Sequence, residues 1–527
     1  MKILPLTCLK NYFLKDPVLD FLKLYYPRCK DQLNSSPIYL PPERDHSRIL
    51  FLQSDQLKAN IIHRLKDYDL QYNPRHTYEL ISRIDETPEL ILIRPEYKNN
   101  RYVCSPDLIL GRKASLDITG KEQITLLNIK NIDHTSGENY KRWIKAEMMM
   151  NHSILKKMHP TLSFSMTYGI IDKNAKYIDL ESENKFLSLK GKSPIFSEGE
   201  RNSWLRQERE PHRASALGSA KVLSIEEDIE DAEEWNRVLY EEGYKWMLTG
   251  MYPPHENLLP NMSQKMDQPW GDIKKELAQR WGELSYLVGL GGNVRSELHS
   301  KKIFSYRDPK LLSTLSEIEG IRERDLVEQV IKRIDFPQPI QKLKEEKSEV
   351  PILVVDTESL MIPYSKDGKT YKGDIMIGAL LINKEGREMK WFINKEEEEC
   401  KKEYYEWYDS LKEKPEMILH YSPADLRVMS PKMCEICKDV YPLVKSFFIK
   451  KKDSPFNGVR NFSLKTISNI LFGDMYRDCK IKDGVQAATS LYWSLKKDED
   501  SFLEDVKAYN EVDCKALFQV WKYIERR

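Results

Sequence analysis

Pro351-Ile352-Leu353-Val354-Val355-Asp356-Thr357-Glu358 is the stretch that decides the fold of the C-terminal third of the chain. Its first part is a run of aliphatic, mostly β-branched residues, which is typical of a strand buried on both faces. Asp356 and Glu358 follow directly, and because alternate side chains share a face of a strand, we expect their carboxylates to project together. Two adjacent carboxylates repel one another unless a cation neutralises them, and oxygen ligands suit magnesium or manganese. The stretch therefore predicts a metal site at the end of a buried strand.

Two segments further along the chain carry acids that can join this pair. The run from Ile418 to Asp425 predicts a short apolar strand, a turn and a helix start that carries an acid. Tyr509 and Asp513 lie four residues apart in a segment with helical apolar spacing, so we expect them on one face of a helix. Asp-x-Glu alone is a common surface pattern, but its place after an apolar strand and the ordered downstream acids favour a site.

In this order, the segments resemble the DEDD exonuclease superfamily of ribonuclease-H-like proteins, in its tyrosine-bearing variant. Asn461–Lys465, before a helix expected to end at Gly473, and Asp483–Tyr492 are similar to further motifs of that branch. The resemblance implies 3′-to-5′ exonuclease activity with two Mg²⁺ or Mn²⁺ ions, in which Lys465 contacts a phosphate. Its catalytic residues would be Asp356, Glu358, Asp425, Tyr509 and Asp513, of which the four acids bind metal and Tyr509 orients the attacking water. Ser422-Pro423-Ala424 stands where the family often has an amide residue, so the segment of Asp425 departs most from the pattern.

The N-terminal part, residues 1–195, resembles the RecB-like branch of the PD-(D/E)xK nucleases. Arg101–Ile109 is similar to the strand that carries the first acid, here Asp107, and Lys130 stands at the lysine of the next strand. Asn128 replaces the second carboxylate and brings no negative charge, so we expect a degenerate site that is catalytically silent and a domain that binds nucleic acid or acts as a scaffold. Residual activity at Asp107 and Lys130, and a mistaken family assignment, remain alternatives.

The middle part, residues 196–340, is expected to be helical. Val288-Gly289-Leu290-Gly291 is similar to a helix-hairpin-helix turn, in which Gly289 and Gly291 would let the backbone approach a phosphate. Arg295 is the side chain expected to contact that phosphate. A plain loop between two helices is the alternative, because short glycine-rich turns are common there.

The whole sequence predicts an α/β multidomain protein with parts at 1–195, 196–340 and 350–527. This order resembles predicted RecB-family nucleases, many of which carry an iron–sulfur cluster, but residues 195–260 contain no cysteine, so none is expected. The resemblance favours DNA modestly over RNA as the substrate, because hairpin-like turns and RecB-like domains usually accompany DNA. The alternative function is a non-catalytic nucleic-acid-binding subunit of a replication, repair or RNA-processing complex.

Composition limits these expectations only weakly. The chain has 527 residues with 83 basic and 82 acidic ones, so its net charge of +1 neither favours nor opposes nucleic acid. The sequence contains no run of about 18 apolar residues and no signal-peptide core. It therefore predicts an intracellular protein, cytoplasmic or nuclear, without a membrane partner. The acidic run Glu226–Asp231 is expected to be a solvated helix face. Cys434 and Cys437 are expected to be two thiols on one helix.

Overall fold

The computed structural model of the chain describes these residues of the sequence: 4–42, 44–64, 70–72, 91–110, 123–130, 138–159, 165–171, 176–179, 186–190, 195–198, 224–264, 267–318, 321, 324–332, 340–344, 346–366, 369–450, 461–497 and 499–526. Within these ranges the chain is an α/β protein with 15 α-helices and three mixed sheets. None of the helices in the described ranges is both long enough and apolar enough to cross a membrane.

The chain forms two compact units. The first comprises Met1–Ile38, Leu50–Trp281 and Glu317–Gly320, and the second Tyr39–Ile49, Gly282–Ser316 and Ile321–Arg527. The expected junctions near 195 and 340 adjoin segments 199–223 and 333–339, which lie outside the described residues. The three-part division of the sequence therefore stays a prediction.

The first unit contains two of the sheets. A three-stranded sheet has the order β1-β5-β4, and an eight-stranded sheet has the order β11-β10-β9-β8-β7-β6-β3-β2. The strands are β1 (Leu4–Pro5), β2 (Leu70–Tyr72), β3 (Ile91–Ile93), β4 (Tyr97–Lys98), β5 (Tyr102–Cys104), β6 (Leu108–Leu110), β7 (Gln123–Ile129), β8 (Ser165–Ile171), β9 (Lys176–Asp179), β10 (Phe186–Lys190) and β11 (Ile195–Glu198). The helices are α1 (Lys10–Phe13), α2 (Val18–Cys29), α3 (His46–Arg64, which begins in the second unit), α6 (Glu138–Met158), α9 (Ile225–Glu242) and α10 (Gly271–Trp281).

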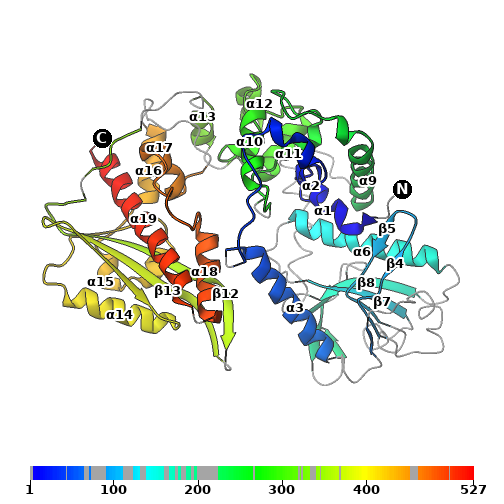
Figure 1. Cartoon of the computed structure of the whole chain (residues 1–527), viewed down its shortest axis with the longest axis horizontal. Coiled ribbons are helices and arrows are strands. Elements are labelled where there is room, and N and C mark those ends of the chain that lie inside the picture. Colours follow the sequence, from blue (N-terminus) through cyan, green and yellow to red (C-terminus); the bar gives the residue numbers. More distant parts are fainter. Residues whose placement is uncertain are drawn as a thin grey trace. The chain divides into compact units, whose positions relative to one another are not determined.

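Helix α6 packs on strands β7 and β8 of the larger sheet (Figure 1). Its buried face carries Trp143, Ile144 and Leu155, spaced as the core-facing side of an amphipathic helix. Helices α1 and α9 contact α6 in turn, so the three helices share one apolar core with the sheet.

The acidic run at the start of α9 is only in part the solvated face that its charge predicts. Asp228 is 5% exposed, and its Oδ2 accepts hydrogen bonds from Nε and Nη2 of Arg142 on α6 at 2.9 and 2.5 Å. A carboxylate can be buried when a guanidinium satisfies it, so Asp228 joins two helices, whereas Glu226, Glu230 and Asp231 of the same run are exposed.

The second unit contains the third sheet, with the order β14-β13-β12-β15-β16. Its strands are β12 (Ile352–Lys366), β13 (Lys369–Ile382), β14 (Arg387–Ile393), β15 (Met417–His420) and β16 (Cys437–Asp439). Its helices are α11 (Gly292–Ser300), α12 (Leu311–Glu317, whose last residue falls in the first unit), α13 (Arg324–Lys332), α14 (Glu397–Ser410), α15 (Pro431–Cys434), α16 (Val440–Lys450), α17 (Leu464–Phe472), α18 (Gly484–Lys497) and α19 (Asp500–Glu525). A short 3₁₀ helix, η6, spans Asp425–Val428.

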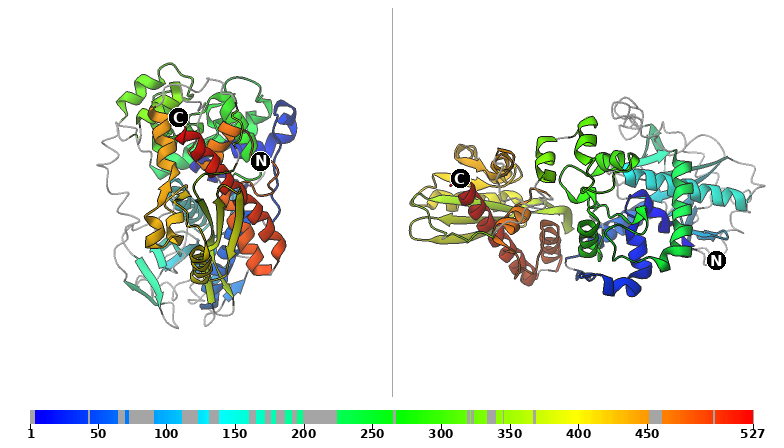
Figure 2. Two further views of the ribbon diagram at one scale, coloured as in Figure 1. Left: turned by 90° about the vertical axis from the view of Figure 1, so that its left-hand side faces the viewer. Right: turned by 90° about the horizontal axis from the view of Figure 1, so that it is seen from above.

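Strand β12 is buried on both faces, as its sequence predicts: Ile352–Val355 are at most 1% exposed. It pairs antiparallel with β13 and parallel with β15. Leu353 and Val355 share a core with α14, whereas α18 and α19 contact the strand as well. Figure 2 shows α19, in red, running along the yellow-green strands of this sheet. Because side chains alternate along a strand, Asp356 and Glu358 lie on the face opposite to Leu353 and Val355.

The two cysteines of the Cys-x-x-Cys segment do not share a helix. Helix α15 ends at Cys434, and Cys437 begins β16, which pairs parallel with β15. The expectation of one helix was wrong because pairing with β15 draws Cys437 into the sheet, and such tertiary pairing overrides local helical spacing.

Candidate metal centre

Three carboxylates converge on the α19 face of the second unit's sheet. One oxygen from each of Asp356, Glu358 and Asp513 lies within 4.8 Å of the other two. Asp356 and Glu358 belong to β12, whereas Asp513 comes from α19, about 155 residues later along the chain. Glu358 and Asp513 are 6% and 8% exposed, so this acid cluster is largely shielded from water.

Burial and mutual repulsion dominate the electrostatics of this cluster. Burial raises the pKa of the Asp356 and Glu358 carboxyls well above their usual values, and the negative charge of Asp513 raises both further. Burial also raises the pKa of Asp513 to about 6, although hydrogen bonds from Tyr476 and Tyr509 oppose that shift. Charged carboxylates at this separation are unfavourable unless a cation neutralises them. The donor set, three hard carboxylate ligands, fits Mg²⁺ or Mn²⁺.

Asp425 lies beside the acid cluster but outside its group of mutually close atoms. It begins η6, shortly after β15, as the sequence predicts. Its Oδ1 accepts a hydrogen bond from Thr357 Oγ1 at 3.0 Å, and its negative charge raises the pKa of both Asp356 and Glu358. The fourth predicted ligand is therefore near enough to act on the others electrostatically, while its carboxylate is held by Thr357.

Tyr509 and Asp513 share a face of α19, as their spacing predicts. The hydroxyl of Tyr509 hydrogen-bonds to Asp513 and lowers its pKa. A second tyrosine, Tyr476, donates a hydrogen bond from its hydroxyl to Oδ1 of Asp513. The ring centroids of Tyr476 and Tyr509 lie 5.8 Å apart. Tyr476 is completely buried in the segment between α17 and α18. The sequence gives no periodicity or motif there that singles it out, so it was missed.

Asn510 was missed as well, although its position carried a signal. Its Nδ2 donates to Oδ2 of Asp356 at 2.7 Å and to the main-chain oxygen of that residue at 3.3 Å. Residues three apart share a helical face, so the spacing from Asn510 to Asp513 could have placed the amide at the same site.

Lys465, the predicted phosphate contact, lies at the edge of the acid cluster. It follows Ser463, which caps the N-terminus of α17. Its Nζ lies 5.2 Å from the ring centroid of Tyr476 and donates to the main-chain oxygen of Lys482. Burial lowers the pKa of Lys465, and its positive charge in turn lowers the pKa of Asp513. Phosphate binding by Lys465 stays a prediction.

The N-terminal predicted site is held together by internal bonds. The main-chain N–H of Asp107 donates to Oδ1 of Asn128 at 2.9 Å, so those two residues are neighbours. The Asp107 carboxylate contacts Lys58 Nζ through Oδ1 at 2.7 Å and the N–H of Ile129 through Oδ2 at 2.7 Å. The Lys58 ammonium group thus occupies the position beside the Asp107 carboxylate that a metal ion would take if Asp107 were a ligand.

Lys130 forms no hydrogen bond with Asp107 or Asn128 among those of the described residues. Its Nζ lies 2.8 Å from Oε2 of Glu147 on α6, and Glu147 raises its pKa against the effect of burial. Asp107 and Lys130 therefore bond to different partners, although the charge of Asp107 also raises the pKa of Lys130. The silence of this site stays a prediction.

The glycine-rich segment lies between α10 and α11, and its contact with a phosphate stays a prediction, but Arg295 has a different place from the one predicted. Gly289 has a φ of +79°, and a Cβ there would come within 2.5 Å of Val327 Cγ2 on α13, so both conformation and packing require glycine. Gly291 precedes α11. Arg295 is 7% exposed, and its Nε donates to Oε1 of buried Glu283 at 2.6 Å. Its guanidinium is thus engaged inside the unit and is not presented to a phosphate.

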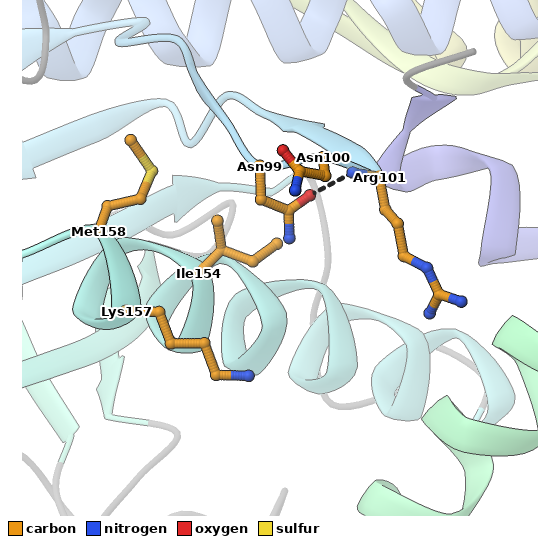
Figure 3. A pocket seen from close by; sticks show the side chains of 6 residues that line it. All are labelled: Asn99, Asn100, Arg101, Ile154, Lys157 and Met158. Atoms are coloured by element: carbon orange, nitrogen blue, oxygen red, sulfur yellow. Dashed lines mark hydrogen bonds between the residues drawn. The ribbon is translucent and has the colours of Figure 1, made fainter. Parts of the chain in front are cut away.

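A pocket of about 430 Å³ lies elsewhere, in the first unit, between the turn from β4 to β5 and the end of α6 (Figure 3). It is lined by Asn99, Asn100, Arg101, Ile154, Lys157 and Met158. Asn99 Oδ1 accepts from the main-chain N–H of Arg101 at 2.8 Å, so this amide serves the turn. The six residues include no carboxylate, so this pocket offers no group of acidic metal ligands.

No protein-family model, no curated protein and no solved structure matches this chain. A functional assignment therefore depends on the residues and contacts of the acid cluster.

Proposed function

We propose that the chain is a divalent-metal-dependent nuclease that hydrolyses phosphodiester bonds of nucleic acid, acting from the 3′ end and on DNA in preference to RNA. The observation that carries the proposal is the convergence of Asp356, Glu358 and Asp513 from two distant elements. Burying three acids together costs free energy. If the contact served packing alone, apolar residues in their place would make the fold at least as stable. The convergence of the three carboxylates therefore favours a site that binds a cation.

The residues around the acid cluster divide the chemistry of hydrolysis among them. Bound Mg²⁺ or Mn²⁺ supplies positive charge that activates a water nucleophile and stabilises the phosphorane-like charge of the transition state. Asp356, Glu358 and Asp513 would hold the cation, and Asp425, next to them, would complete the ligand set. Tyr509 would orient the attacking water through its hydroxyl, and Lys465 would neutralise a neighbouring phosphate.

The polarity and the preference for DNA rest on the resemblance to DEDD exonucleases. The elements agree with that resemblance in their order: β12 with two acids, β15 followed by η6 with the third, and α19 with the tyrosine and the last acid. The alternative function is a non-catalytic nucleic-acid-binding subunit. It is favoured by the hydrogen bond from Thr357 to Asp425, because this acid lies outside the group of three close carboxylates.

The test is degradation of 3′-labelled and 5′-labelled single-stranded DNA and RNA with Mn²⁺ or Mg²⁺ and with chelator. Asp356→Asn keeps the shape of the side chain and removes one charge of the acid cluster, and we expect it to abolish cleavage. Asp439→Asn is the matched control: this carboxylate accepts from the N–H of Tyr441 at the start of α16, and asparagine can replace aspartate there.

Metal-dependent release of mononucleotides by the parent and by Asp439→Asn, lost in Asp356→Asn, would support the proposal and name the polymer. Lys130→Ala, in the first unit, should leave cleavage intact. Binding of nucleic acid without cleavage under any metal would favour the alternative function.

A further inference from the structure

Asn510 occupies a space that only a glycine on the neighbouring strand leaves open. Asp356 of β12 and Gly378 of β13 are paired in the sheet. A Cβ at Gly378 would lie 1.7 Å from Oδ1 of Asn510, which is far inside contact distance. The φ of Gly378 is outside the left-handed range, so the backbone itself does not require glycine there. The requirement is therefore room for the amide of Asn510.

The amide is placed for donation and not for acceptance. Asn510 is completely buried, and its Nδ2 donates to Oδ2 and to the main-chain oxygen of Asp356. Its Oδ1 accepts no hydrogen bond from any residue that the structure describes. A buried acceptor without a partner costs free energy, so a residue chosen for stability alone would be apolar at this position.

We infer that Asn510 is a positioning residue that fixes the Asp356 carboxylate for cation binding, and that Gly378 is glycine in order to admit it. The inference rests on the proposed metal centre. A neutral donor is the suitable partner, because lysine or arginine would supply the positive charge itself and a further acid would add repulsion. One oxygen of Asp356 is engaged, and the remaining lone pairs of the carboxylate stay available.

The experiment measures Mn²⁺ binding to the full chain by calorimetry without nucleic acid, together with thermal unfolding. Asn510→Ala removes the donor and leaves a void, whereas Gly378→Ala forces the amide out of its place. We expect each to bind Mn²⁺ at least about 10-fold more weakly than the parent and to unfold at lower temperature. In Asn510→Ala/Gly378→Ala the new methyl group enters the void, so thermal stability should recover relative to Gly378→Ala, while Mn²⁺ binding stays weak.

The double variant separates positioning from packing. Recovery of both stability and Mn²⁺ affinity would mean that Asn510 only fills space, and parent-like affinity in Asn510→Ala would overturn the inference directly. If a single variant does not fold, the double variant carries the test. Gln519→Ala is the control, because Gln519 is a buried amide on the same helix that bonds to the backbone of Lys344, and it should lose stability without losing Mn²⁺ affinity.

Failure of the proposed function has a different signature. If the parent binds no Mn²⁺, or if Asp356→Asn binds it as the parent does, the metal centre itself is wrong. If the parent binds and Asp356→Asn does not, but the Asn510 and Gly378 variants bind normally, only the inference about Asn510 fails.

Discussion

At the scale of single residues, neutral hydrogen-bond donors surround the acid cluster. Asn510 donates to Asp356 and Tyr476 donates to Asp513, and neither adds charge. Donors of this kind orient carboxylate ligands and leave their charge for the cation. The carboxylates of the cluster therefore repel one another and are held in fixed orientations. Both features make the binding of a cation more favourable.

Acids that are paired with basic groups make a folded protein more stable as pH rises. The acid cluster should have the opposite effect on stability. The pKa of Asp513 rises from 3.8 to about 6 in the folded state, and those of Asp356 and Glu358 rise as well. The folded protein therefore holds protons that the unfolded chain releases, so this contribution to stability falls as pH rises from about 4 through 6. We expect chelator-treated protein to lose thermal stability between pH 5 and pH 7, and Mn²⁺ to restore more of it at pH 7 than at pH 5.

Replacing Asp513 by asparagine should flatten that pH dependence, because the variant has one proton-binding group fewer. Unfolding temperatures that rise with pH in chelator for the parent would contradict the assignment of a repulsive cluster.

Tyr476→Phe tests the second donor. It removes one hydroxyl and keeps the ring that contacts Tyr509 and Lys465. The lost hydrogen bond should raise the pKa of Asp513, so the acidic limb of the activity profile should move to higher pH, with kcat lower by about 10-fold. Tyr97→Phe, which removes a buried hydroxyl bonded to the main-chain oxygen of Asn151 in the first unit, should leave the profile unchanged.

At the scale of elements, Lys58 joins α3 to Asp107, the residue directly before β6. Lys58→Met should destabilise the first unit by about 1–3 kcal/mol, because it leaves a shielded carboxylate without its charged partner. Adding Asn128→Asp would place a second carboxylate beside that of Asp107 after its ammonium partner has been removed. We expect the double variant, and neither single variant, to bind one Mn²⁺ more than the parent.

A calorimetric stoichiometry measures that gain. No extra Mn²⁺ in the double variant would show that these two side chains cannot form a metal site, even without the lysine.

At the scale of the whole molecule, the chain divides into two compact units, and the acid cluster belongs to one of them. We expect two transitions in scanning calorimetry and a selective effect of Mn²⁺ on the transition of the second unit. Binding at 100 times the dissociation constant stabilises a folded state by roughly 2.7 kcal/mol. Asp356→Asn should abolish that shift, whereas equal shifts of both transitions would place a metal in the first unit too.

The path of the chain explains why these units could not be located from the sequence. Residues 39–49 belong to the second unit, where Arg44 bonds to Asp505 of α19 through Nη2 at 3.1 Å and to the main-chain oxygen of Lys480. A segment near the N-terminus thus packs with the last helix. Nothing local in residues 39–49 predicts this partner, because the complementary charge lies more than 400 residues away.

The sequence by itself determined the buried strand Ile352–Val355, the projection of Asp356 and Glu358 to one face, and the pairing of Tyr509 with Asp513 on one helix. These features follow from the periods of strands and helices, which are local properties of the backbone. Only the tertiary structure decided that Tyr476 and Asn510 bind the acids, that Arg295 is buried against Glu283, and that Thr357 holds Asp425. Those outcomes depend on which distant elements meet and on the space between them, down to the missing Cβ of Gly378, and no local period encodes them.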